Sequence, residues 1–159
     1  MGQPIITTKS RFIYDPSLVL YLPLWQLDGN SIMSKDARGH LCTVNGATWG
    51  LQGRTFNGTD QDILIGSAVN ALNPKLNGGA GVTCCTWIKP TVITAGATEN
   101  VLLNVIIDTT NSGFRLSING DTSKIRQAGR SVVTDGANAS NSGSALTYNI
   151  CYFVVVVLD

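Results

Sequence analysis

Hydrophobic residues recur along this chain in alternations and short runs of strand length. Alternation is clearest in residues 113–118 and is also present in residues 41–44. Because successive side chains of an extended strand point to opposite faces, a period of two predicts β-strands. Longer apolar runs, in residues 18–25, 100–108 and 147–159, predict buried strands, and Pro23 marks the end of the first one.

Residues 82–90 form a further predicted strand whose two faces are hard to tell apart. Alternation divides the segment into two sets, Val82, Cys84, Thr86 and Ile88 on one face and Thr83, Cys85 and Trp87 on the other. Both sets contain apolar side chains or thiols, so we expect a strand that is buried on both sides. Residues 125–133 predict a weaker strand.

Glycine and asparagine divide these strands with turns. Asn45-Gly46 and Asn119-Gly120 are hairpin signals, and residues 58–61 are expected to turn a strand at 54–57 back onto one at 62–65. Residues 134–144 contain mostly Gly, Asn, Ser and Ala, which predicts an exposed, mobile loop. Residues 68–76 include Pro74 and are expected to hold a single helical turn at most.

Composition sets the class of protein. The chain has 159 residues, which suits one domain, and only 13% of them are charged, with a net charge of +1. Scattered Lys and Arg argue against a nucleic-acid partner. The start lacks the features of a signal peptide, and the nine-residue apolar run at 150–158 is too short for a helix to cross a bilayer, so we expect synthesis in the cytoplasm and no membrane insertion.

Residues that could carry catalysis are sparse. Glu99 is the only glutamate and lies in a loop-like context, Asp60 and Asp62 flank a predicted turn, and His40 is the only histidine. A retaining glycosidase needs two carboxylates about 5 Å apart, and nucleophilic hydrolysis needs a base beside the nucleophile. We therefore expect no enzyme. Four cysteines without metal-ligand or disulfide-scaffold spacing are expected to be reduced thiols that behave as small hydrophobes, namely Cys42, Cys84, Cys85 and Cys151.

Several of these segments also resemble a known family when they are taken in order. An L-V-L-Y-L-P-L strand (18–24) is followed by an aspartate loop, then by G-A-T-W (46–49), G-R-T-F-N-G (53–58) and T-C-C-T-W-I-K-P (83–90). This order resembles that of laminin G-like, or concanavalin A-like, domains. The resemblance covers residues 18–159 and implies an antiparallel two-sheet jelly-roll sandwich, preceded by a leader arm at residues 1–17 whose Phe12, Ile13 and Tyr14 pack onto the domain or a neighbour.

The chain departs from the family pattern in two places. Asp36-Ala37-Arg38-Gly39 lacks the serine of the family's aspartate loop, and the family strands that follow the segment matching residues 147–159 are not present. We expect either a fragment of a longer polypeptide or an incomplete sandwich to which a neighbour adds strands.

The resemblance implies candidate binding residues at the rim of the fold. Members of this family bind calcium through loop carboxylates and amides, which makes Asp28, Asp36, Asp60 and Asp62 the candidate calcium ligands. Turn formation is the alternative interpretation of these aspartates. An exposed aromatic ring can stack on a sugar, and among the rings Trp25 is the candidate, with Asp28, Asn30 and Asp36 for the hydroxyls.

The remaining tryptophans, Trp49 and Trp87, occupy positions that the family fills with core side chains. The resulting expectation is a non-catalytic module that recognises a glycan or a host or cell surface within a virion, tail-fibre or cell-surface assembly, as in bacteriophage and metagenomic surface proteins. The alternative is a capsid-decoration or self-assembling shell component without a glycan ligand, which makes a homo-oligomer or larger assembly the expected state.

Overall fold

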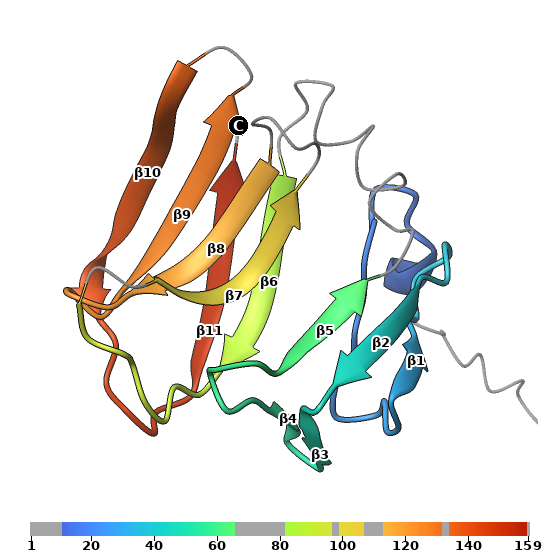
Figure 1. Ribbon diagram of the computed structural model, residues 1–159. Helices are drawn as coiled ribbons and strands as arrows, with labels where there is room; N and C mark the ends of the chain where they lie inside the picture. Colours follow the sequence, from blue (N-terminus) through green and yellow to red (C-terminus); the bar gives the residue numbers. More distant parts are fainter. Residues whose placement is uncertain (1–10, 66–81, 97–98, 107–112, 132–133, 159) are drawn as a thin grey trace, which may run out of the picture. The chain divides into compact units, whose positions relative to one another are not determined.

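The computed structural model describes residues 11–65, 82–96, 99–106, 113–131 and 134–158, and this part of the chain is all-β with antiparallel sheets (Figure 1). The chain divides into two compact units, residues 1–71 and 72–159, each with its own hydrophobic core. Within the described ranges, no helix is long and apolar enough to span a membrane. The all-β prediction is confirmed, whereas the jelly-roll topology stays a prediction.

The first unit contains a three-stranded sheet and a small hairpin. The sheet has the order β1-β2-β5, and β3 pairs with β4 in the hairpin. Its core consists of Leu27, Ile32, Cys42, Val44 and Ala47, supplied by alternate positions of the sheet strands and by the adjoining loops. The elements of this unit are the 3-10 helix η1 (Arg11–Tyr14) and the strands β1 (Ser31–Met33), β2 (Leu41–Asn45), β3 (Thr48–Gly50), β4 (Gly53–Thr55) and β5 (Asp62–Ile65).

The second unit is a two-layer sandwich. A four-stranded sheet of order β10-β9-β8-β7 packs against the two-stranded sheet β11-β6, as Figure 1 shows. The core between the layers centres on Leu116, which is fully buried, with Phe114 and Ile118 from the same strand and Val154 and Val156 from β11. The strands are β6 (Val82–Ile88), β7 (Glu99–Ile106), β8 (Gly113–Asn119), β9 (Lys124–Ser131), β10 (Thr134–Ala145) and β11 (Tyr152–Leu158).

The strand predicted at residues 18–25 is wrong. None of residues 18–25 lies in a strand, and three backbone groups of the segment bond to the loop that follows β1. The backbone N–H of Tyr21 donates to Asp36 Oδ2 at 2.9 Å, the carbonyl of Tyr21 accepts from the N–H of Lys35 at 2.9 Å, and the carbonyl of Val19 lies 2.8 Å from His40 Nε2. A buried backbone needs partners, and here a loop supplies them in place of a ladder.

Two predicted strand pairings in the first unit are also wrong. Gly46 has φ +72°, as a turn requires, but β2 pairs with β1 and β5 rather than with the segment that follows Gly46. Strand β4 pairs with β3 rather than with β5. Arg54 on β4 holds this region together, because its Nη1 donates to the carbonyl of Ala47 (3.0 Å) and its Nη2 donates to those of Leu27 (2.6 Å) and Gly29 (2.7 Å).

The loop predicted at residues 134–144 is wrong as well, since β10 occupies this segment. It pairs antiparallel with β9, and register shifts between Thr134 and Asn138 and between Asn141 and Ala145 absorb the misfit. Strand propensity depends strongly on context, so a neighbouring strand that offers backbone partners outweighs the poor propensity of Gly, Asn and Ser. The strands expected at 41–44, 82–90, 100–108, 113–118 and 125–133 are confirmed over their described residues, with β6 ending at Ile88, and so is the turn at Asn119-Gly120. Residues 107–108 and 132–133 of these predictions lie outside the described residues. The helical turn expected at 68–76 lies outside the described residues.

Candidate binding face

The candidate site is the outer surface of the β11-β6 sheet, on the side away from the core of the second unit. Tyr152, Val154 and Val156 pack inward on β11, so the alternate side chains of the strand point outward. The same alternation on β6 leaves Cys84 and Ile88 against the core. We call the six outward residues the outer β6–β11 face: Thr83, Cys85, Trp87, Phe153, Val155 and Val157.

Trp87 and Phe153 form the centre of this face. They are directly opposite in the antiparallel register, with ring centroids 5.0 Å apart and ring planes inclined by 38°. Trp87 is 70% exposed and Phe153 is 54% exposed. Large aromatic side chains contribute most of the binding energy of many interfaces, so two adjacent exposed rings make this face the candidate binding surface.

The rest of the face is apolar and uncharged. Val155 and Val157 continue the row on β11 and are about half exposed, while Cys85 and Thr83 lie opposite them on β6. None of the six residues carries a charge at neutral pH. The face therefore suits a ligand that offers apolar C–H surface and no charge.

The prediction that residues 82–90 are buried on both sides is wrong. One face of β6 packs on the core, whereas Thr83, Cys85 and Trp87 are exposed. The core position expected for Trp87 is wrong for the same reason. Trp49 is half-buried, and Trp25 is 47% exposed in the turn that follows residues 18–23.

Asp36, a predicted ligand, is a structural residue whose two oxygens already accept backbone hydrogen bonds. Its Oδ1 accepts from the N–H groups of Arg38 (2.9 Å) and Gly39 (3.2 Å), and its Oδ2 accepts from Tyr21. Burial raises the pKa of this carboxyl, but hydrogen bonds from the Ser34 side chain and from the backbone of Tyr21 and Arg38 outweigh it and lower the pKa below its ordinary value. Asp28 and Asn30 are exposed, whereas Asp36 is buried.

The other predicted calcium ligands also accept hydrogen bonds, Asp28 and Asp60 within turns and Asp62 across the β2–β5 pair. Asp28 Oδ1 accepts from the N–H of Gly29 at 2.6 Å, Asp60 Oδ1 accepts from Asn57 Nδ2 at 2.7 Å, and Asp62 Oδ1 accepts from Asn45 Nδ2 at 2.6 Å. Among the residues that the structure describes, no group of three or more His, Cys, Asp and Glu side chains is placed to hold a metal ion. Calcium binding at these residues stays a prediction without geometric support.

Glu99 and His40 also have structural partners. Glu99 begins β7, not a loop as its sequence context indicated, and its carboxylate pairs with Arg115 Nη1 at 3.0 Å and with Arg126 Nη1. His40 is buried, and its backbone N–H donates to Ser34 Oγ at 2.7 Å. The expectation that the chain is not an enzyme stays a prediction.

Comparisons with protein-family models, with curated proteins and with solved structures find no match to this chain. The laminin G-like resemblance therefore stays a prediction, and the candidate site depends on geometry alone. Sequence reasoning missed Phe153 because residues 153–158 contain no polar side chain to mark the outer face. The outward face of β11 can be identified only from its register with β6 and from the side on which the four-stranded sheet packs.

Proposed function

We propose that this chain is a non-catalytic recognition module that binds a neutral glycan through the outer β6–β11 face, as part of a virion, tail-fibre or cell-surface assembly. The observation that carries the proposal is the pair of adjacent exposed rings, Trp87 and Phe153. Sugars present a flat C–H surface that stacks on aromatic rings, and the exposed indole N–H remains able to donate to a hydroxyl. The lack of charge on the face favours neutral over acidic sugars.

Glycan-array binding of the purified chain, with and without EDTA, tests this function. We expect binding to neutral oligosaccharides that EDTA does not alter, because the face contains no carboxylate. Trp87→Ala should weaken binding about tenfold or more, since losing one stacked ring costs about 1.5–3 kcal/mol of buried apolar contact.

Trp25→Ala is the matched control, because Trp25 is also an exposed tryptophan but lies in the other unit. Binding that is lost in Trp25→Ala and in EDTA, and kept in Trp87→Ala, would contradict the proposal and support the rim site with calcium. Absence of binding to any glycan would also contradict it.

Self-assembly through the same face is the second candidate function. The observation that favours it is the apolar row Phe153, Val155 and Val157, which offers no hydrogen bond to a sugar hydroxyl. Sedimentation velocity distinguishes the two functions. Oligomers that Trp87→Ala dissociates, together with no glycan binding by the unaltered chain, would favour assembly.

A further inference from the structure

Strand β11 has one free edge. It bonds to β6 along one side, and none of the strands described in the structure pairs with its other side. Exposed edges in natural sheets are normally blunted by charged side chains, proline, bulges or short length. Strand β11 has seven residues, none of them charged or proline, and its register with β6 is regular throughout. The edge is therefore competent to pair with another strand.

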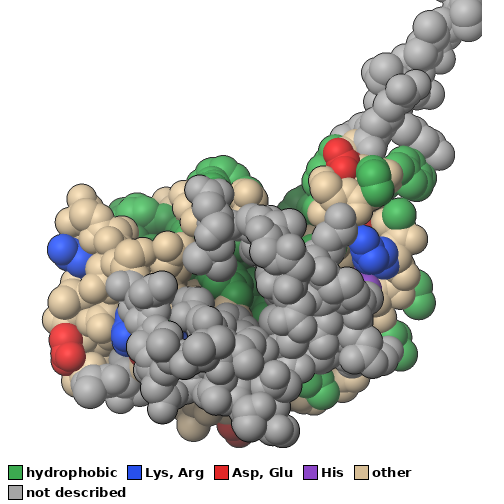
Figure 2. Space-filling view, turned by 90° about the horizontal axis from the view of Figure 1, so that it is seen from above, with side chains coloured by type: hydrophobic (Ala, Val, Ile, Leu, Met, Phe, Trp, Pro, Cys, Tyr) green, Lys and Arg blue, Asp and Glu red, His purple; other side chains and the backbone are tan. Residues whose placement is uncertain are grey.

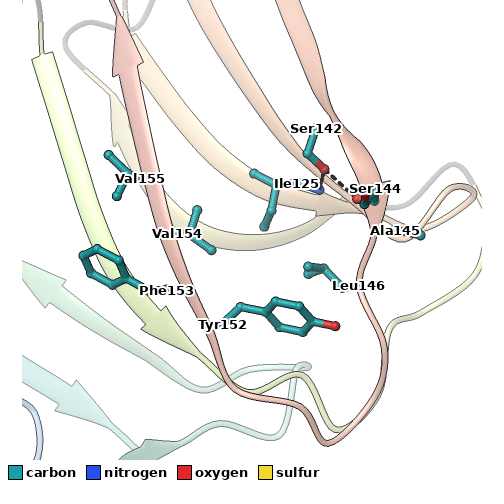
Figure 3. A pocket seen from close by; sticks show the side chains of 9 residues that line it. All are labelled: Ile125, Ser142, Ser144, Ala145, Leu146, Tyr152, Phe153, Val154 and Val155. Atoms are coloured by element: carbon teal, nitrogen blue, oxygen red, sulfur yellow. Dashed lines mark hydrogen bonds between the residues drawn. The ribbon is translucent and has the colours of Figure 1, made fainter.

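A groove runs beside this edge. Its volume is about 280 Å³, and it lies between β11 and the β9–β10 side of the four-stranded sheet, as Figure 3 shows. The groove is there because four strands face only two, which leaves the inner surface next to β9 and β10 partly uncovered. Its lining is mainly apolar, with Ile125, Leu146 and Val154 at its centre.

The side-chain hydroxyls of Ser142 and Tyr152, which line the groove, already have partners. Ser142 Oγ accepts from the N–H of Ile125 at 3.2 Å and donates to the carbonyl of Ser144 at 2.8 Å, and the Tyr152 hydroxyl accepts from the N–H of Thr147 at 2.8 Å. The volume is also below the range of roughly 300–1,000 Å³ that is typical of small-molecule pockets. An extended backbone with apolar side chains matches both the free edge and the groove better than a small molecule does.

We propose that the free edge of β11 pairs antiparallel with β11 of a second copy of this chain, with Val155 at the twofold axis. Val155 is the middle residue of the strand, so this register pairs the full length of both strands. The result is a continuous four-stranded sheet of order β6-β11-β11-β6.

The sequence of β11 is compatible with itself in this register. Val155 lies opposite Val155 and Phe153 opposite Val157, so outward side chains stay outward, and Val154 lies opposite Val156 on the core side. Like charges directly opposite each other destabilise a sheet, and an uncharged strand avoids this penalty when it meets its own copy. A second copy of β11 can therefore pair with the free edge without complementary charges and without a different pattern of inward and outward side chains.

The test is sedimentation equilibrium of the purified chain over a range of concentrations in reducing buffer, which prevents disulfide-linked dimers. We expect a reversible dimer for the unaltered chain. Val155→Lys should weaken dimerisation at least tenfold, because it places two ammonium groups opposite each other at the axis, whereas the monomer tolerates the change since Val155 is 52% exposed.

Thr83→Lys is the matched control. It adds the same charge to the same outer face, but on β6 and away from the free edge, so it should leave the dimer intact. An equimolar mixture of Val155→Lys and Val155→Glu should restore dimers that neither variant forms alone, which also shows that both variants are folded.

Three results would overturn the proposal: a chain that stays monomeric at all concentrations, dimerisation that Thr83→Lys abolishes as fully as Val155→Lys does, or no recovery in the mixture. The inference does not depend on glycan binding. Trp87→Ala should reduce glycan binding and leave edge pairing unchanged, so failure of one proposal is distinguishable from failure of the other.

Discussion

At the scale of single residues, Asp36 accepts hydrogen bonds from three backbone N–H groups, two of them in its own loop and the third, that of Tyr21, in the segment at 18–25. Asp and Asn are common in turns because their side chains bond to nearby backbone. Asp36 extends this role to Tyr21, fifteen residues earlier in the chain, and so fixes the segment that contains Tyr21 to the loop. The carboxylate therefore has a structural role in the first unit.

Asp36→Asn should lower the free energy of unfolding by about 1–3 kcal/mol. An amide offers only one acceptor oxygen, so at least one of the bound N–H groups would face the NH₂ group of the new side chain. Urea denaturation measures the change. Asp28→Asn is the control, since Asp28 is exposed and its Oδ1 accepts from the adjacent N–H of Gly29, and it should alter stability by less than about 0.5 kcal/mol.

The same carboxylate predicts a dependence of stability on pH. Because the pKa of Asp36 is lowered in the folded protein, its contribution is fully present above the ordinary Asp pKa of about 3.9 and is lost as the pH falls through the lowered value. The difference in unfolding free energy between the unaltered chain and Asp36→Asn should narrow below about pH 4. A constant difference down to pH 2 would contradict this assignment.

The four cysteine thiols should differ in their rates of reaction with a maleimide. Cys85 and Cys151 are exposed, whereas burial raises the pKa of the Cys42 and Cys84 thiols and so lowers their thiolate fraction. We expect Cys85 and Cys151 to react first with a maleimide in the native protein, as mass spectrometry of digested samples would show. Rapid labelling of Cys84 would mean that the β6 register is wrong.

The limits of sequence reasoning at this scale are visible in Trp87. Alternation correctly placed Trp87 and Cys85 on one face of their strand, but both faces contained apolar groups, so the pattern could not assign the core side. The core side is set by a cluster that includes Leu116 of a different sheet, and Cys84 and Ile88 pack against this cluster. That information lies in contacts between distant parts of the chain.

At the scale of elements, two segments have structures opposite to those predicted. Residues 18–25 were expected to form a strand and do not, whereas residues 134–144 were expected to form a loop and belong to β10. The apolar segment has no ladder, because Asp36 and the residues around it satisfy its backbone. The segment rich in Gly, Asn and Ser is a strand, because β9 pairs with it antiparallel on both sides of two register shifts. In both cases the available partner decided the structure, and residue preference did not. Strands with alternation, such as β8, were predictable because packing and propensity agree.

Ser142 on β10 provides an element-scale test. Its hydroxyl bonds to Ile125 N–H and to the carbonyl of Ser144 at the register shift between Asn141 and Ala145. Ser142→Ala should lower the unfolding free energy by about 1 kcal/mol and increase hydrogen exchange at the Ile125 amide. Ser140→Ala, on the same strand at an exposed position, should change neither measurement appreciably.

At the scale of the whole molecule, each unit depends on a small core. The second unit is centred on Leu116, which has no exposed surface, and the first is centred on Cys42 and Val44. On the face drawn in Figure 2, hydrophobic side chains of the described residues reach the solvent in several places. The ion pairs of Glu99 with Arg115 and Arg126 are partly exposed. Stability of this chain therefore depends on the two cores more than on surface ion pairs.

Leu116→Ala should cost about 2–5 kcal/mol of unfolding free energy, because it removes buried methyl groups and leaves a cavity between the two sheets. Leu51→Ala is the control, since Leu51 is 84% exposed in the turn between β3 and β4 and contributes little to packing. Thermal unfolding followed by near-ultraviolet circular dichroism measures both. Equal effects of the two variants would show that Leu116 is not at the centre of the core.

The orientation of Trp87 also gives the protein an optical probe of its own. An indole in contact with solvent emits at longer wavelength and is quenched by iodide, whereas one covered by a bound molecule shifts to the blue and is shielded. With Trp25 and Trp49 replaced by phenylalanine, Trp87 is the single remaining indole. Its fluorescence would then report the binding of a molecule to the outer β6–β11 face without any added label.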